Sequence, residues 1–211
     1  MNLIDKIKVV VLDCYGTIVG YGLDPLQKQT ARKGLIEFLK KCEANNIQIA
    51  IATDDHRKDR VWGLLKEIGI AEYFTSERMI YSELPPSDHF LFYGYESLDF
   101  TKHKHGDKNF ALIAEDFGIS LDELYFVGDN GVGRDKRSAE RYNVQWTNCE
   151  QYHPNAKFGD DYDFNKILEP FAWSDSTAKD FAQFYTTGTG PRSMNGKVEY
   201  FKNQTQKGET E

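Results

Sequence analysis

Long apolar runs, paired cysteines and an excess of positive charge are all missing from this sequence. No run approaches the about 20 apolar residues that cross a bilayer, and Met1 to Asp5 lacks the basic-then-apolar form of a secretory signal. We therefore expect a cytoplasmic protein without a membrane partner. The cysteines, Cys14, Cys42 and Cys149, are odd in number and lack C-x-x-C spacing, which indicates neither a disulfide framework nor a zinc ribbon. We expect these thiols to be reduced and mostly buried.

The charge balance of the chain is acidic, with 33 Asp and Glu against 26 Lys and Arg and a net charge of -7. This balance repels polyphosphate at long range, so nucleic acid is not expected as a partner. The rest of the composition, 40% hydrophobic and 28% charged, is typical of a soluble domain that buries a core. At 211 residues the chain fits one such domain with some irregular sequence.

Short apolar runs alternate with amphipathic stretches along the chain. Val9-Val10-Val11-Leu12 has no polar alternation, which is typical of a strand covered on both faces. Leu35, Leu39 and Cys42 recur at helical spacing among charged residues. We predict strands at 8–12, 47–52, 78–82, 124–127 and 144–146, and helices at 30–43, 58–68, 109–117 and 136–142. This alternation predicts an α/β fold with a doubly wound, Rossmann-like parallel sheet.

The predicted elements form a single core domain without a large cap. We assign residues 1–173 to this core, and residues 83–106, which are rich in aromatics and contain Pro85-Pro86, to a flap-like insertion. Residues 174–211 are rich in Ser, Thr, Gly, Lys, Asn and Gln and have no hydrophobic period. We therefore expect a poorly ordered polar tail.

Side chains capable of chemistry directly follow three of the predicted strands. Asp13 follows the first strand, Thr53 the second and Asp129 the fourth. Lys108 lies just before the helix that leads into the fourth strand. Each residue alone would be an ordinary turn former or helix cap. Together they indicate a site, because ligands of an open parallel sheet bind beyond the carboxyl ends of its strands.

The same residues resemble the four motifs of the haloacid dehalogenase-like hydrolases. Asp13-Cys14-Tyr15-Gly16-Thr17 resembles the first motif, an aspartate at a strand end followed by x-x-Gly-Thr. Thr53 resembles the second motif and Lys108 the third. The fourth is resembled by Val127-Gly128-Asp129, Asp135 and Ser138-Ala139. The motifs occur in the family's order, so the resemblance implies a hydrolase with the fold predicted above.

The resemblance implies covalent catalysis with Asp13 as the nucleophile. Asp13 and Asp129 crowd negative charge into one crevice, which is unfavourable unless a cation joins them. The family supplies Mg²⁺, here held by Asp13, the backbone carbonyl of Tyr15, and Asp129, within the oxygen shell that this ion prefers.

The remaining motif residues are implied to bind phosphate. Thr53 would donate its hydroxyl to a phosphoryl oxygen, and Lys108 would neutralise the developing charge. Backbone N–H groups around Gly16, Thr17 and Asp54 would complete the cradle. The implied partner is a phosphorylated substrate, which is bulky because no cap closes the site.

Three positions depart from the family's phosphatases. Those enzymes usually carry a second aspartate, a general acid and base, where this chain has Tyr15. General acid–base catalysis is worth about 10²–10⁴-fold, so poor leaving groups should suffer most. The Asp-x-Tyr-Gly-Thr form is similar instead to that of 2-haloacid dehalogenases, which need no metal. At the third motif this chain has Lys108-Asn109 where members usually show Lys-Pro, and Lys102 and Lys104 nearby are alternatives. In the fourth motif, five residues separate Asp129 from Asp135, a wider spacing than usual.

These departures keep alternatives open. We treat Asp135 as a residue that supports the metal ligands, or as an ordinary negative charge at a helix N-terminus. For the whole protein, a Mg²⁺-dependent phosphatase is the first hypothesis. A 2-haloacid dehalogenase and a catalytically weak binding protein on the same fold are the alternatives, because fold alone does not choose between them.

Overall fold

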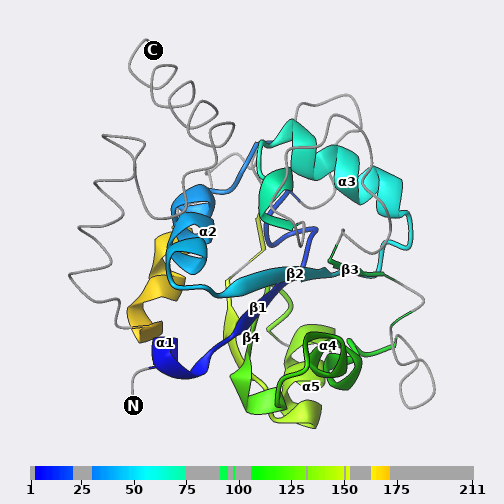
Figure 1. Cartoon of the computed structure of the whole chain (residues 1–211). Coiled ribbons are helices and arrows are strands. Elements are labelled where there is room, and N and C mark those ends of the chain that lie inside the picture. The colour runs from blue at the N-terminus through cyan, green and yellow to red at the C-terminus, as the bar shows by residue number, and fades with distance from the viewer. Residues whose placement is uncertain are drawn as a thin grey trace. The chain divides into compact units, whose positions relative to one another are not determined.

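A computed structural model describes residues 3–20, 30–74, 91–94, 97, 106–131, 133–149, 151–152 and 163–171. Within these residues, five parallel strands form one sheet in the order β3-β2-β1-β4-β5 (Figure 1). The strands are β1 Val9–Leu12, β2 Gln48–Ala52, β3 Phe92–Tyr93, β4 Leu124–Gly128 and β5 Gln145–Asn148. The predicted parallel, Rossmann-like α/β sheet is confirmed.

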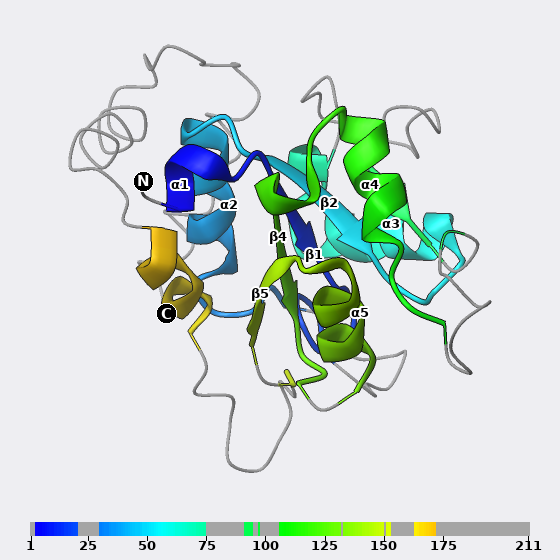
Figure 2. The same cartoon turned by 90° about the horizontal axis from the view of Figure 1, so that it is seen from below.

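Helices cover both faces of this sheet. On one face lie α2 Leu35–Ala44 and α3 Lys58–Glu67, and on the other α4 Phe110–Phe117 and α5 Arg134–Tyr142, as Figure 1 and Figure 2 show. The short helical segments are α1 Leu3–Lys6, η1 Ala71–Phe74, η3 Leu121–Glu123 and η4 Phe164–Phe171. The rings of Phe38 and Phe164 join α2 to η4, edge to face at a centroid distance of 5.3 Å. None of the helices in the described ranges is long and apolar enough to cross a membrane.

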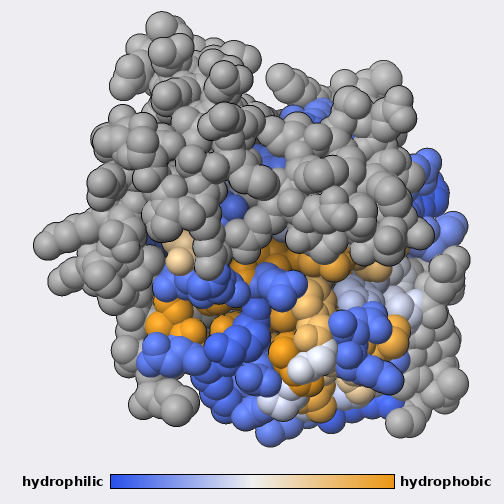
Figure 3. All heavy atoms as spheres, viewed as in Figure 1, coloured by the Kyte–Doolittle hydropathy of each residue, from blue (hydrophilic) through white to orange (hydrophobic). Residues whose placement is uncertain are grey.

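The core follows from side-chain alternation along the central strand. Val9 and Val11 of β1 lie in one buried cluster with Phe110 of α4. Because successive side chains of a strand point to opposite faces, Val10 and Leu12 face the side of α2 and α3. All four residues of β1 are buried, so the strand is covered on both faces as predicted. Over the described surface near α4 and α5, hydrophilic and hydrophobic residues are interspersed (Figure 3).

Most predicted elements agree with the structure to within two residues at each end. One helix start is wrong, because α2 begins at Leu35 rather than Thr30. Gly34 precedes it with a left-handed φ of 77°, which is not a helical conformation. The three cysteines are free thiols and buried, as predicted.

The edge of the sheet beside β2 comes from an unpredicted strand. The strand predicted at 78–82 lies outside the described residues. The strand that pairs with Ile51 and Ala52 is β3, which falls within the segment assigned to the flap-like insertion. Most of that insertion, and the tail at 174–211, also lie outside the described residues.

Candidate active site

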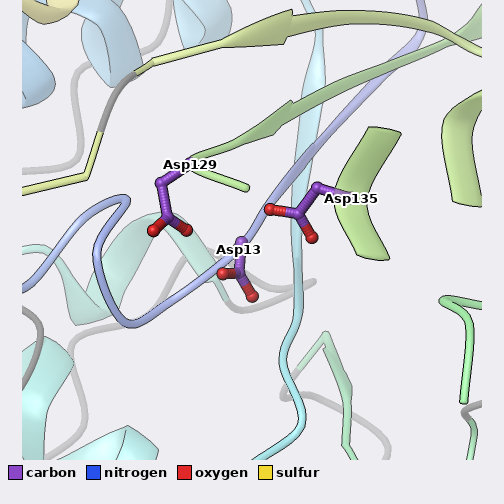
Figure 4. A group of neighbouring side chains, drawn as sticks. All are labelled: Asp13, Asp129 and Asp135. Carbon is purple, nitrogen blue, oxygen red and sulfur yellow. The ribbon is translucent and has the colours of Figure 1, made fainter. Parts of the chain in front are cut away.

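Three aspartates converge at the carboxyl end of the sheet. Asp13 follows β1, and its backbone N–H donates to the carbonyl of Val127 on β4 at 2.9 Å. Asp129 follows β4, and Asp135 lies in the first turn of α5. One carboxylate oxygen of each lies within 4.8 Å of the others, and Figure 4 shows the three side chains turned toward one another. Asp135 therefore lies in the cluster despite its wider sequence spacing from Asp129.

A buried lysine joins two of these aspartates. The Nζ of Lys108 lies 3.1 Å from Oδ1 of Asp13 and 3.1 Å from Oδ1 of Asp135. Its backbone N–H donates to Oγ of Ser138 at 3.0 Å. Helix α5 thus supplies both a carboxylate for the ammonium group and a hydroxyl for the backbone of Lys108.

Asp107, the residue before this lysine, is also buried and binds the same helix. Nε of Arg137 donates to Oδ1 of Asp107 at 2.9 Å, and Nη1 of Arg141 donates to its Oδ2 at 3.1 Å. Such charge-assisted hydrogen bonds are stronger than neutral ones. The segment that carries Lys108 is therefore anchored to α5 on both sides of the Asp107–Lys108 peptide bond.

The cluster holds more negative charge than one lysine neutralises. Burial, opposed by Lys108 and reinforced by Asp135 and Asp129, raises the pKa of Asp13 to about 8. Burial and the nearby Asp135 raise the pKa of Asp129 as well. For Lys108, burial opposes the charge, but the carboxylates of Asp13 and Asp135 raise its pKa above the usual range. With the lysine held as a cation, three carboxylates share one positive charge, and a proton or a second cation would relieve their repulsion.

The residues present fit a divalent cation. Their ligand atoms are carboxylate oxygens, which Mg²⁺ and similar hard cations prefer. Among the described residues, Asp129 has no cationic partner. Its Oδ1 accepts from the hydroxyl of Thr17 at 3.3 Å, and its Oδ2 accepts from Nε2 of Gln151 at 3.0 Å. An ion beside Asp13 and Asp129 would supply the positive charge that this side of the cluster lacks.

The loop after β1 is held tightly against Asp129. Gly16 has a φ of 81°, and a Cβ at this position would collide with the carboxylate of Asp129. The Nη1 atom of the buried Arg32 donates to the carbonyls of Gly16 and Thr17, each at 3.3 Å. The N–H of Tyr152 donates to the same Gly16 carbonyl at 2.7 Å. These contacts fix the backbone between the two aspartates.

The loop after β2 lies beside the first. Thr53 is fully buried, and its N–H donates to the carbonyl of Tyr93 at 3.0 Å. Its side-chain oxygen accepts the N–H of Asp55 at 3.3 Å. The carboxylate of Asp54 pairs with Arg134 at the start of α5, so this loop is tied to the helix that carries Asp135.

Tyr15, at the position of the missing aspartate, is bound to Asp55. Its hydroxyl donates to Oδ2 of Asp55 at 2.8 Å, and the guanidinium of Arg60 lies 5.5 Å from its ring centroid. Burial opposes the charge on Asp55, but hydrogen bonds from Arg57 and Tyr15 lower its pKa to about 2. Burial also raises the pKa of the Tyr15 hydroxyl above its usual range. Near neutral pH, Asp55 has no proton to give and Tyr15 retains its own.

Comparison with solved structures identifies the fold. A predicted phosphoglycolate phosphatase from Haemophilus somnus is similar over 77% of this chain and 97% of its own, with 15% identity and a TM-score of 0.52. The present chain shares that fold. At this identity the likeness establishes the fold alone.

Hydrolases of the haloacid dehalogenase superfamily are also among the similar structures. One is from Geobacter sulfurreducens, with 16% identity, coverage of 67% and 89% of the two chains, and a TM-score of 0.44. Another is from Ehrlichia chaffeensis, with 14% identity, coverage of 70% and 92%, and a TM-score of 0.43. No protein-family model and no curated protein matches the sequence.

The structure brings together most residues singled out from the sequence. Asp13, Lys108, Asp129 and Asp135 form one cluster, which Thr17 joins through Asp129. Sequence reasoning missed several charged residues around this site, among them Arg32, Asp55 and Asp107. A single buried charge produces no periodic pattern. The only available signal was adjacency, because Asp55 follows Asp54 and Asp107 precedes Lys108.

Proposed function

We propose that this protein is a Mg²⁺-dependent phosphohydrolase of the haloacid dehalogenase type, acting through an aspartyl-phosphate on Asp13. The observation that carries the proposal is the contact of Lys108 with Asp13 and Asp135 beside Asp129. A nucleophile, a fixed cation for phosphoryl charge and oxygen ligands for a metal lie in this one cluster. The fold is compatible with this activity, although it does not by itself select it. We also propose a cytoplasmic location and a bulky phosphorylated substrate.

In the proposed reaction, a carboxylate oxygen of Asp13 bonds to phosphorus as the bond to the leaving oxygen breaks. Lys108 orients Asp13 through its 3.1 Å contact and neutralises charge on the phosphoryl oxygens. Thr53 already accepts a hydrogen bond from Asp55, which leaves its hydroxyl proton for a phosphoryl oxygen. Water then cleaves the acyl-phosphate and restores Asp13.

The proposed metal ligands are Asp13, the backbone carbonyl of Tyr15, and Asp129. Bound there, Mg²⁺ would screen the carboxylates from the incoming phosphate and draw charge from the phosphoryl group. We assign Asp135 the role of holding Lys108 as a cation, since their side chains lie 3.1 Å apart. This pairing keeps the ammonium group next to Asp13.

The leaving group receives no proton from the position of Tyr15. The hydroxyl of Tyr15 donates its hydrogen bond to Asp55, and the low pKa of Asp55 keeps that carboxylate ionised. Esters whose leaving group departs without protonation should therefore react fastest. This makes p-nitrophenyl phosphate the first substrate to try.

The test measures hydrolysis of p-nitrophenyl phosphate with Mg²⁺ and with EDTA, for wild type and for Asp13→Asn. We expect activity only with the metal, and a loss of about 10³-fold or more in Asp13→Asn. Intact-mass measurement should detect a phosphorylated form of the wild type that Asp13→Asn lacks. The control is Asp5→Asn, which changes an exposed carboxylate of α1 and should match wild type.

Wild-type activity equal to that of Asp13→Asn would refute the proposal. The dehalogenase alternative is then examined with 2-chloropropionate, whose halide leaves without a proton or a metal. The acidic cluster favours phosphoryl chemistry over this alternative, because attack on carbon would need no cation beside Asp129. Inertness toward both substrates would favour the binding-protein alternative.

A further inference from the structure

An open pocket of about 410 Å³ adjoins the aspartate cluster. Its lining residues are Asp129, Asn130, Gly131, Asn148 and Gln151. Asp129 belongs to both the cluster and the pocket, so a ligand in the pocket lies beside the proposed metal site. The volume falls within the about 300–1,000 Å³ of typical small-molecule sites. The pocket is therefore large enough for the leaving group of a small phosphate ester.

Two glycines make room for the amide side chains of this pocket. A Cβ at Gly131 would collide with the amide of Asn148, and a Cβ at Gly133 would collide with the amide of Asn130. The backbone therefore approaches both amides more closely than a side chain would permit. The side-chain amides of Asn148 and Asn130 therefore pack directly against the backbone of Gly131 and Gly133.

The described lining is polar and almost uncharged. Apart from Asp129 and the backbone of Gly131, it consists of the amides of Asn130, Asn148 and Gln151. An amide both donates and accepts hydrogen bonds, and a hydroxyl does the same, so the two are well matched. A second anionic group of a ligand would call for cations in the lining, and an aromatic base for a stacking partner. The described lining contains neither.

We propose that this pocket binds a neutral, hydroxyl-rich leaving group, so that the substrate is a phosphate monoester of a sugar or another polyol. This assignment rests on the proposed function, because the phosphate of the substrate would bind at the metal that Asp129 would hold. Gln151 connects the two sites, since its Nε2 donates to Oδ2 of Asp129 at 3.0 Å. A sugar or polyol alcohol is a poor leaving group that Tyr15 does not protonate, so these esters should turn over more slowly than p-nitrophenyl phosphate.

The test compares phosphate esters of primary alcohols that carry different numbers of hydroxyl groups. The hydroxylated probes are glucose 6-phosphate, ribose 5-phosphate and glycerol 3-phosphate, and the reference is n-propyl phosphate. Binding of each to Asp13→Asn with Mg²⁺ is measured by calorimetry, so no turnover is needed. We expect at least one hydroxylated ester to bind about tenfold or more tightly than n-propyl phosphate, as a few well-placed hydrogen bonds allow.

Variants of the lining then locate this preference. In the Asp13→Asn background, Asn148→Leu should reduce the preference for the hydroxylated ester to about twofold or less. The reason is that one neutral hydrogen bond is worth roughly two- to tenfold in affinity. Gly131→Ala, which pushes a methyl group against the amide of Asn148, should reduce the preference as well. Gln145→Leu is the matched control. Gln145 is an exposed amide at the other end of β5, and this variant should keep the full preference.

Absence of any preference for the hydroxylated esters would overturn the subsite, as would a preference that survives both Asn148→Leu and Gly131→Ala. These outcomes differ from failure of the proposed function. Loss of that function is detected as metal-independent or absent hydrolysis of p-nitrophenyl phosphate, whereas the subsite is decided by equilibrium binding alone.

Discussion

Replacing Asp107 with alanine tests whether the segment that carries Lys108 depends on its neighbouring carboxylate. This carboxylate is 0% exposed and pairs with Arg137 at 2.9 Å and Arg141 at 3.1 Å. Breaking a buried ion pair usually costs about 3–5 kcal/mol. The low end applies, since the two arginine side chains are 36% and 17% exposed and can regain water. We expect a loss of about 3 kcal/mol in the free energy of unfolding and a fall of about 6–12 °C in Tm.

Two further variants calibrate this result. Asp107→Asn keeps one side-chain oxygen as an acceptor but loses the charge, and should cost about 1.5 kcal/mol. Glu140→Ala removes an exposed carboxylate of α5 whose partner among the described residues is Lys136, four residues before it, and should leave stability unchanged. Unfolding in urea, followed by circular dichroism, gives the free energies.

The same proteins are assayed on p-nitrophenyl phosphate. A displaced Lys108 should lower kcat more than it raises KM, because its ammonium group contacts the nucleophile. A cost below about 1 kcal/mol for Asp107→Ala, which is what a surface ion pair is worth, would refute the reasoning. If Asp107→Ala loses stability as expected but keeps the wild-type kcat, the contacts of Asp107 stabilise the fold without positioning Lys108 for the reaction.

Two other substitutions test the loops around the cluster. Gly16→Ala should abolish the metal-dependent hydrolysis, because Gly16 has a φ of 81° and a Cβ there would collide with Asp129. The control is Gly118→Ala, at φ 64° with open space around the Cβ, which should cost about 1–2 kcal/mol of stability and keep activity. Similar activity in both variants would contradict the steric argument. Asp55 has a pKa of about 2, lowered mainly by Arg57 and Tyr15, against about 3.9 when unfolded. A lowered pKa stabilises the fold above the unfolded value and ceases to do so as the pH falls toward the folded one. The stability difference between wild type and Asp55→Asn should therefore be constant above about pH 5 and shrink below about pH 4, and a difference that grows on acidification would contradict the assigned pKa.

Local pattern was enough to predict the sheet, because β1, β2 and β4 are short apolar runs with no polar alternation. It failed for β3, which consists of Phe92 and Tyr93 alone and is too short to have a period. It also placed the start of α2 too early, because the residues before Gly34 do not interrupt the apolar spacing. Here the left-handed backbone of Gly34, rather than side-chain composition, sets the helix boundary.

The candidate site was predicted to the extent that its residues end strands. Asp13, Thr53 and Asp129 could be found in this way, because parallel strands present their carboxyl ends at one edge. Arg32 and Asp107 could not, since each is a charge whose burial depends on partners distant in the chain. Arg32 contacts carbonyls 15 and 16 residues away, and Asp107 contacts arginines 30 and 34 residues away.

The order of the strands separates the reacting residue from the pocket beside it. β1, which leads to Asp13, is hydrogen-bonded on both sides. Within the described part of the chain, β5, which ends on Asn148, is an edge strand with one neighbour. A substitution at the end of β5 therefore disturbs a single ladder and leaves the bond between Asp13 and Val127 in place. If the proposed subsite binds the leaving group, substitutions there can change which esters are preferred without altering the reaction at Asp13. Directed evolution toward new esters should begin at position 148.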